Sequence, residues 1–522
     1  MKKTLKSVLA LLTIVLVLSG CNSTSKKTIN KEKLNTINIA ISSEANAEKL
    51  DATAYDSSMA IYGAVYEPLI QYGKKGEFQP ALATSWEISN NGKKYVFNLD
   101  KKAKFSDGSL VNSEAVKFTI ERAKLNNKTS TLQTLNNLDR IEIIDANTVA
   151  LFFKEVSNQV LAELCQTRPL RIMSPNSVED GHVSGAFKKA IGSGPFVVKE
   201  STAEHVLMSP NRYFNDEKPV NYQVDFKTIS DGSSRTLALK SGEIDIVGGT
   251  LGEIKDSDID YLKTDKSFTV EEFEGTMSHF LAFNPDNTML NTAIRHAIEL
   301  SIDKKLLSDQ KLNGLFRENV QFVSKTNQKP SEYNSEKAKT IFENEGFKKN
   351  KDGYYEKDNK ILSFDLVIQT TEFPKWKEQA EVVESELKKV GVKINIIILD
   401  SDSYYDVLWT TKKYDMIFYR TYTDAYLPYN FLNSLYHNTD KEHGVLSNDE
   451  ELTNQLNEFA SMFKETDQQK IADKFLKRIS DETLAIPIDY KNEKFAVSEK
   501  VSKFIYSGLS DSPIDYKNLK VN

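Results

Sequence analysis

The feature that most constrains the fold is the steady alternation of strand-like and helix-like segments along the chain. Short apolar or alternating runs predict strands, and apolar residues at helical spacing predict helices. Strands are predicted at residues 37–41, 95–99, 141–144, 148–153, 196–199, 205–208, 244–247, 280–283, 364–368, 392–399, 415–419 and 486–490. Helices are predicted at residues 57–66, 113–123, 234–240, 292–302 and 375–390. This alternation favours mixed α/β lobes.

Length and charge narrow the class of protein. About 490 residues follow the polar N-terminal region, which is too many for one core of the usual size, so two or three domains are expected. The net charge is −6, and no basic stripe is present, so nucleic acid is not an expected partner. No shift in composition marks a domain boundary.

Residues 1–20 have the layout of a secretory signal peptide, with lysines before an apolar run over residues 8–18. The run is about half of the roughly 20 residues that span a bilayer. It ends at Leu18-Ser19-Gly20-Cys21, which resembles the bacterial lipobox. Cys21 is therefore expected to be the lipidated first residue of the mature chain. A plain signal peptide or a short membrane anchor is the alternative.

Residues 21–35 are predicted to form a lipidated, flexible tether, because Ser, Thr, Lys and Asn dominate there and cannot bury enough apolar surface to offset ordering. Lipidation would use one of the two cysteines and leave Cys165 alone. This residue lies among apolar neighbours, so we expect a buried, inert thiol.

Catalytic motifs are absent from the sequence. We find no GxSxG, HExxH, Walker A or CxxC motif, and no GxGxxG after a strand. The six histidines include no pair at helical ligand spacing. We therefore do not expect an enzyme. Active sites can assemble from distant residues, so an extracellular hydrolase with an unrecognised site stays open as an alternative.

Several segments, in the same order along nearly the whole mature chain, resemble the substrate-binding proteins of the peptide and nickel class of ABC importers (extracellular solute-binding protein family 5). They are residues 65–69 (VYEPL), 80–89 (PALATSWEIS), 105–108 (FSDG), 192–196 (GSGPF), 241–245 (SGEID), 294–298 (IRHAI), 301–304 (SIDK), 414–417 (YDMI) and 486–488 (IPI). Judged from their residues alone, most of these segments have structural roles rather than ligand-binding ones.

The resemblance implies an α/β, two-lobe periplasmic-binding-protein-like fold (type II, large class), with an extra subdomain on the first lobe and a hinge between the lobes. Lobe I would comprise residues 36–278 plus 485–522, with the subdomain at about 75–190. Lobe II would comprise residues 279–484. The ligand would be enclosed between them.

Within this class, residues 167–171 resemble the Arg-Pro segment of the nickel-binding branch, whose first arginine clamps a carboxylate of the metal chelate. The resemblance implies that Arg168 is a ligand residue. The chemistry agrees, because the planar guanidinium fork matches a carboxylate. A surface salt bridge is the alternative role for Arg168, and Arg171 could have either role.

Residues 419–428 resemble the aromatic segment of the same branch and imply that Tyr422 and Tyr426 contact the ligand. This segment follows a strand end, where α/β folds place ligands. Arg420 is a further candidate there. Asp424 is another, because peptide receptors use an aspartate in this loop to hold the amino group of the peptide.

Met59 matches a cleft methionine of the nickel branch, and a core methionine is its alternative. His437 and His443 fall where the branch carries its cleft histidine and are candidate metal ligands, although lone loop histidines are commonly solvated. The chain departs from the branch at residues 126–132, which lack the aromatic residue found there.

The sequence therefore predicts a monomeric receptor that is lipid-anchored on the extracellular face of the cell membrane, of the Gram-positive type. It would hold no permanent cofactor. It would capture nickel, or cobalt or zinc, as a chelate with a small molecule and deliver it to an ABC permease. An oligopeptide receptor of the same fold is the alternative, with Arg168 and Asp424 holding the two ends of a short peptide.

Overall fold

The computed structural model describes residues 34–522 except 44, 56–58, 74–75, 215–218, 251, 331, 422–425 and 439–443. Asn35–Asn522 form one unit. The predicted signal peptide and the lipidation residue Cys21 lie outside the described residues. Within the described part of the chain, no helix combines the length and the apolar character needed to span a membrane.

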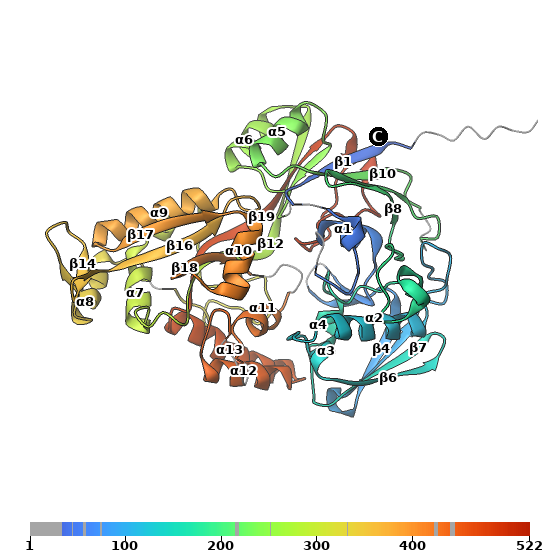
Figure 1. Cartoon of the computed structure of the whole chain (residues 1–522), viewed down its shortest axis with the longest axis horizontal. Coiled ribbons are helices and arrows are strands. Elements are labelled where there is room, and N and C mark those ends of the chain that lie inside the picture. Colours follow the sequence, from blue (N-terminus) through green and yellow to red (C-terminus); the bar gives the residue numbers. More distant parts are fainter. Residues whose placement is uncertain are drawn as a thin grey trace, which may run out of the picture. The chain divides into compact units, whose positions relative to one another are not determined.

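A large mixed sheet is the main element of the described chain (Figure 1). Its strands, in spatial order, are β17 (Lys393–Leu399), β16 (Ser363–Gln369), β18 (Met416–Arg420), β12 (Phe268–Phe283), β19 (Ala485–Ser498), β11 (Ile246–Gly248), β1 (Thr36–Ile41), β10 (Gln223–Thr228), β9 (His205–Pro210) and β8 (Phe196–Ser201). The long antiparallel pair β12 and β19 joins the two halves of this sheet. Their register shifts between Glu274 and Ser278, so the pairing is interrupted near the middle of β12.

A separate antiparallel sheet is formed by β4 (Ala83–Ser89), β5 (Lys94–Leu99), β7 (Thr148–Phe153) and β6 (Leu138–Asp145), in that order. Helix α2 (Ser113–Asn126) packs on β6 and β7 (Figure 1). Asn112 caps this helix, because its side chain accepts a hydrogen bond from the backbone N–H of Ala115.

Short strands complete the pairing: β2 (Ile70–Tyr72) with β3 (Phe78–Pro80), β13 (Lys348–Lys349), β14 (Tyr355–Lys357) and β15 (Lys360–Ile361) with one another, and β20 (Val501–Lys503) with β21 (Lys520–Val521). The remaining helices are α1 (Met59–Val65), α3 (Gln133–Asn136), α4 (Val160–Leu164), α5 (Gly232–Lys240), α6 (Asp256–Thr264), α7 (Thr292–Ser301), α8 (Ser335–Asn344), α9 (Trp376–Val390), α10 (Ser401–Asp406), α11 (Pro428–Leu435), α12 (Glu450–Ala460) and α13 (Glu465–Asp481).

Local sequence explains several of these boundaries. Helix α9 packs on β16 and β17 and ends at Gly391, whose φ of 103° is left-handed and easiest for glycine. The predicted strands at 280–283 and 486–490 are confirmed but are only parts of β12 and β19. Helices α3, α4, α6, α8, α10, α11, α12 and α13 were not predicted.

Apolar residues form distinct cores. One core surrounds the fully buried Trp376 and combines α7, α9, α11, α12 and α13 with β12, β16 and β18. Another joins Ile37 and Ile39 of β1 to Val497 of β19 and to Tyr516 near the C-terminus. The two ends of the described chain therefore share a core. Cys165 is buried in a further core, as predicted.

Candidate ligand-binding site

Arg168 is half-buried and lies beside Tyr55. Its Nη1 donates a hydrogen bond of 2.7 Å to the carbonyl of Tyr55, and its guanidinium carbon is 5.1 Å from the centre of the tyrosine ring. The neighbouring Arg171 is buried and donates from Nε to the carbonyl of Gln166 at 3.1 Å. Arg168 is thus the more accessible arginine of the Arg-Pro segment.

Tyr55 connects Arg168 to a cavity of about 450 Å³. The described residues that line it are Glu48, Lys49, Asp51, Ala54, Tyr55, Asn126, Asn127 and Phe187. Asp51 is not a free acid there, because its carboxylate pairs with Arg122 at 2.6 Å. Tyr55 was not singled out in the sequence, because its exposure is a property of the folded chain. Met59, the first residue of α1, is half-buried.

Tyr426 is buried and tied to two other parts of the chain. Its hydroxyl donates 2.8 Å to the carbonyl of Gly508, and its ring meets Tyr72 edge-on at 5.2 Å between centres. Burial raises the pKa of the Tyr426 hydroxyl. Gly76, with φ of +79°, lies so close that a Cβ there would be 2.8 Å from the Tyr426 side chain. Tyr426 therefore has a fixed position and a hydroxyl already engaged.

Arg420 is the last residue of β18 and is 7% exposed. It lies opposite His279 of β12. Burial lowers the pKa of the guanidinium, but the charge of Asp511, followed by Tyr419, Tyr405 and Glu372, raises it more, so the pKa is above its ordinary value. Asp511 was not predicted, and nothing in its local sequence indicates an electrostatic influence on Arg420.

His437 is half-buried, and its Nε2 is 3.2 Å from Oδ1 of Asn457 on α12. Burial lowers the pKa of His437, and the hydrogen bond with Asn457 opposes this. Its imidazole is therefore neutral at neutral pH, which is the form that binds metals. The other predicted ligand residues, Tyr422, Asp424 and His443, lie outside the described residues. Among those described, no three His, Cys, Asp or Glu side chains gather as a metal site would require.

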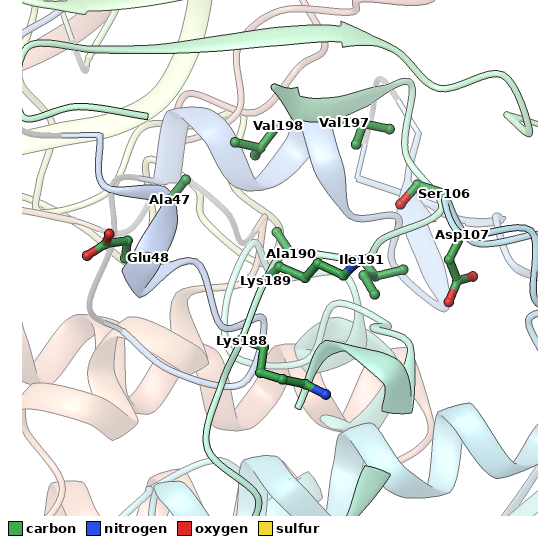
Figure 2. Close-up of a pocket in the computed structure, with 10 residues that line it drawn as sticks. All are labelled: Ala47, Glu48, Ser106, Asp107, Lys188, Lys189, Ala190, Ile191, Val197 and Val198. Carbon is green, nitrogen blue, oxygen red and sulfur yellow. The ribbon is translucent and has the colours of Figure 1, made fainter. Parts of the chain in front are cut away.

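A second cavity, of about 370 Å³, is shown in Figure 2. Its described lining residues are Ala47, Glu48, Ser106, Asp107, Lys188, Lys189, Ala190, Ile191, Val197 and Val198, and none of them is a predicted ligand residue. Asp107 accepts hydrogen bonds from Ser109 and from Asn176, the latter at 2.8 Å. These contacts stabilise the turn at Asp107-Gly108.

The model of the bacterial extracellular solute-binding proteins, family 5 Middle, matches residues 77–443. The chain belongs to this family. Family 5 proteins serve ABC importers as solute-binding proteins rather than enzymes. The predicted α/β, two-lobe periplasmic-binding-protein-like fold is therefore confirmed.

Relatives of this family 5 protein bind different solutes. The nickel-binding periplasmic protein of Escherichia coli (strain K12) is 26% identical over 480 residues, covering 89% of this chain and 90% of that protein. The probable D,D-dipeptide-binding periplasmic protein of the same strain is 24% identical over 496 residues, covering 90% and 92%.

Solved structures agree on the fold. NikA from Brucella suis in complex with Fe(III)-EDTA has a TM-score of 0.80 and 25% identity, covering 93% of this chain and 100% of that one. The oligopeptide-binding protein AppA from Bacillus subtilis, in complex with a nonapeptide, has a TM-score of 0.79 at 18% identity, covering 94% and 100%. At that identity the second likeness concerns the fold alone.

Proposed function

We propose that this family 5 protein captures nickel, or cobalt or zinc, as a chelate and delivers it to the permease of an ABC importer. The observation that carries the proposal is the 26% identity to a nickel-binding periplasmic protein over 89% of the chain. The likeness to NikA in complex with Fe(III)-EDTA supports a chelate, because EDTA carries several carboxylates around its metal ion.

Arg168 would neutralise a carboxylate of the chelator. Its half-buried guanidinium lies next to Tyr55, which lines the 450 Å³ cavity, so a ligand there would meet both a cation and an aromatic ring. Charge-assisted hydrogen bonds from arginine to carboxylate are among the strongest in proteins. Tyr422 and Tyr426 would pack against the same chelate.

At most one protein histidine would complete the metal shell. Nickel favours nitrogen and oxygen donors, and imidazole suits it well. The six histidines include no pair at ligand spacing, so the chelator would supply most donors. His437 is the first candidate because burial lowers its pKa and keeps the imidazole neutral. His443 is the second.

The proposed lobes are residues 36–278 plus 485–522 and residues 279–484, with the subdomain at about 75–190. The core shared by β1 and the C-terminal residues supports a first lobe built from both chain ends. We further propose a monomer held by lipid at Cys21 on the extracellular face of the membrane.

An oligopeptide receptor is the second candidate, because a dipeptide-binding relative is 24% identical over 90% of the chain. In that case Arg168 and Asp424 would hold the two ends of a short peptide.

Calorimetric titration of the protein without its signal peptide separates these functions. Nickel chloride in chelator-free buffer should bind weakly, and addition of free L-histidine should produce tight binding. Submicromolar binding of the bare ion would contradict capture as a chelate. Tight binding of a metal-free short peptide would favour the second candidate.

A further inference from the structure

Strands β12 and β19 pair along most of their length, but the pairing is interrupted near the middle of β12 (Figure 1). Between the last regular pair before the interruption and the first pair after it, β12 has residues 275–277 and β19 has Lys491 alone. Extra residues on one strand bend that strand and break the ladder of backbone hydrogen bonds. The two strands therefore cannot hold each other at this point.

The guanidinium of Arg317 lies at this interruption and bonds to both strands. Its Nη1 donates to the carbonyl of Gly275 on β12 at 3.1 Å and to the carbonyl of Lys491 on β19 at 2.9 Å. Its Nη2 donates to Oδ1 of Asn492 at 2.7 Å, and its Nε is 3.4 Å from a carboxylate oxygen of Glu274. One buried side chain thus joins the strands where their own pairing fails.

The two backbones are also close together here. A Cβ on Gly275 would be 3.0 Å from the carbonyl oxygen of Lys491, so there is little room for a side chain. Asn319 adds a second donor to the same carbonyl of Gly275, at 3.1 Å from its Nδ2. The carbonyl of Gly275 is therefore held by side chains rather than by the ladder between β12 and β19.

The backbone that carries Arg317 is fixed on the core that includes α7, α9 and α13. The preceding residue, Phe316, is 2% exposed in this core, and its backbone N–H donates to the side chain of Gln328 at 2.8 Å. The same segment contacts β19, because the hydroxyl of Tyr490 donates to the carbonyl of Gly314 at 2.9 Å. Arg317 is therefore a fixed part of the proposed second lobe.

The other halves of both strands belong to a different core. Phe273 of β12 packs on Phe495 of β19, with 6.4 Å between the ring centres, in the core that also holds β1. The interruption thus lies between the two cores and close to the proposed lobe boundary after residue 278. Hinges consist of a few residues that absorb large changes in backbone angles. Residues 275–277 and Lys491 have the position of such a hinge.

We propose that the lobes bend at this interruption and that Arg317 is a positioning residue, which fixes the angle of the closed, ligand-holding form. This deepens the proposed function and rests on it, because Arg317 lines neither described cavity and would contribute to affinity through the position of the lobes. Its loss would free the carbonyls of Gly275 and Lys491 and let the lobes open more widely. A smaller population of the closed form lowers the apparent affinity in proportion.

Small-angle scattering of the ligand-free protein is the first test, and it does not depend on which probe binds. Arg317→Met should give a larger radius of gyration than the wild type, because the strands are no longer joined at the interruption. Arg317→Lys keeps the buried charge but lacks the planar fork that reaches both strands, so its radius should also be larger. The lysine variant carries the test if Arg317→Met does not fold.

Arg295→Met is the matched control. Arg295 also donates to backbone carbonyls, those of Leu290 and Glu482 at 2.8 Å each, but both lie within the proposed second lobe. Its loss should lower the melting temperature and leave the radius of gyration unchanged. All variants are compared well below their melting temperatures, so that unfolding does not contribute to the radius.

Binding kinetics are the second test. Stopped-flow tryptophan fluorescence follows the binding of nickel plus L-histidine and, separately, of a metal-free dipeptide to the protein without its signal peptide. For the probe that the wild type binds, Arg317→Met should raise the dissociation rate constant by about tenfold or more and keep the association rate constant within about twofold. Arg295→Met should change neither rate constant.

These outcomes are distinguishable. If Arg317→Met and Arg317→Lys keep the wild-type radius and dissociation rate, or change only as Arg295→Met does, Arg317 is merely structural and the proposal is wrong. If the wild type binds neither probe but the ligand-free radius still rises in Arg317→Met, the proposed function fails while the positioning role of Arg317 stands.

Discussion

At the scale of single residues, Arg168 gives the most specific expectation. Arg168→Ala should weaken binding of a nickel–histidine complex by about 2–5 kcal/mol, as expected when one partner of a buried charge pair is removed. Arg168→Lys should also bind weakly, because an ammonium lacks the planar fork. Calorimetric titration measures both.

Arg212→Ala is a suitable control for Arg168. Arg212 also lies over a tyrosine, 4.6 Å from the ring centre of Tyr213, but neither described cavity has it in its lining. Its loss should leave the affinity unchanged. Wild-type affinity in Arg168→Ala would show that the arginine only anchors Tyr55.

Glu163 should make stability depend on pH. It is 1% exposed, and burial raises its pKa to about 7 against hydrogen bonds from Thr134 and Gln133 that lower it. The folded state thus holds the proton more tightly than the unfolded state, so stability falls as pH rises from about 4.5 to about 7.

Glu163→Gln removes this titration. Between about pH 5 and pH 8 the wild type should lose about 1–3 kcal/mol more stability than the variant. Urea unfolding of the ligand-free protein at several pH values measures the difference. Glu155→Gln, at an exposed carboxylate, should keep the wild-type pH dependence, and an equal slope for Glu163→Gln would refute the role of Glu163.

At the scale of elements, Asn158 holds the C-terminal end of α12. Its side-chain amide donates to the carbonyls of Phe459 at 2.8 Å and Met462 at 2.5 Å, and its backbone N–H donates to Ala460 at 2.8 Å. The last carbonyls of a helix have no partner inside the helix, so a side chain from elsewhere stabilises its end.

Asn158→Ala should therefore lower the free energy of unfolding by about 1–2 kcal/mol, since two hydrogen bonds are lost. Amide exchange over residues 455–463 should become faster. Asn395→Ala, which removes an exposed bond to Asp365 on the neighbouring strand, should leave that region unchanged. Unaltered exchange in Asn158→Ala would mean that α12 ends stably without it.

The strands and helices also show where local patterns were sufficient. The start of α2 and the end of α9 were predicted correctly, because the caps at Asn112 and Gly391 depend on a few neighbouring residues. Helix α11 was missed because it is only eight residues long and begins at a proline, although Asn430, Asn433 and Ser434 lie on one side of it. Helices α12 and α13 do carry an apolar stripe, so their pattern could have been used.

At the scale of the whole molecule, a two-lobe receptor should close around its ligand. Hinge closure in such folds is driven by contacts that form only in the closed state. Small-angle scattering should give a smaller radius of gyration with nickel and L-histidine than without. An unchanged radius at saturating ligand would count against an enclosed site.

The sequence by itself determined the alternating α/β order, the family, the buried Cys165 and the position of Arg168 in its Arg-Pro segment. These depend on residues that are close together in the chain. The tertiary structure decided how far β12 and β19 extend, since these two strands pair with each other along most of their length although they are far apart in the chain. It also decided that Arg420 is buried with an Nε that has no hydrogen-bond partner among the described residues, because burial of a charged side chain arises only when distant segments pack together.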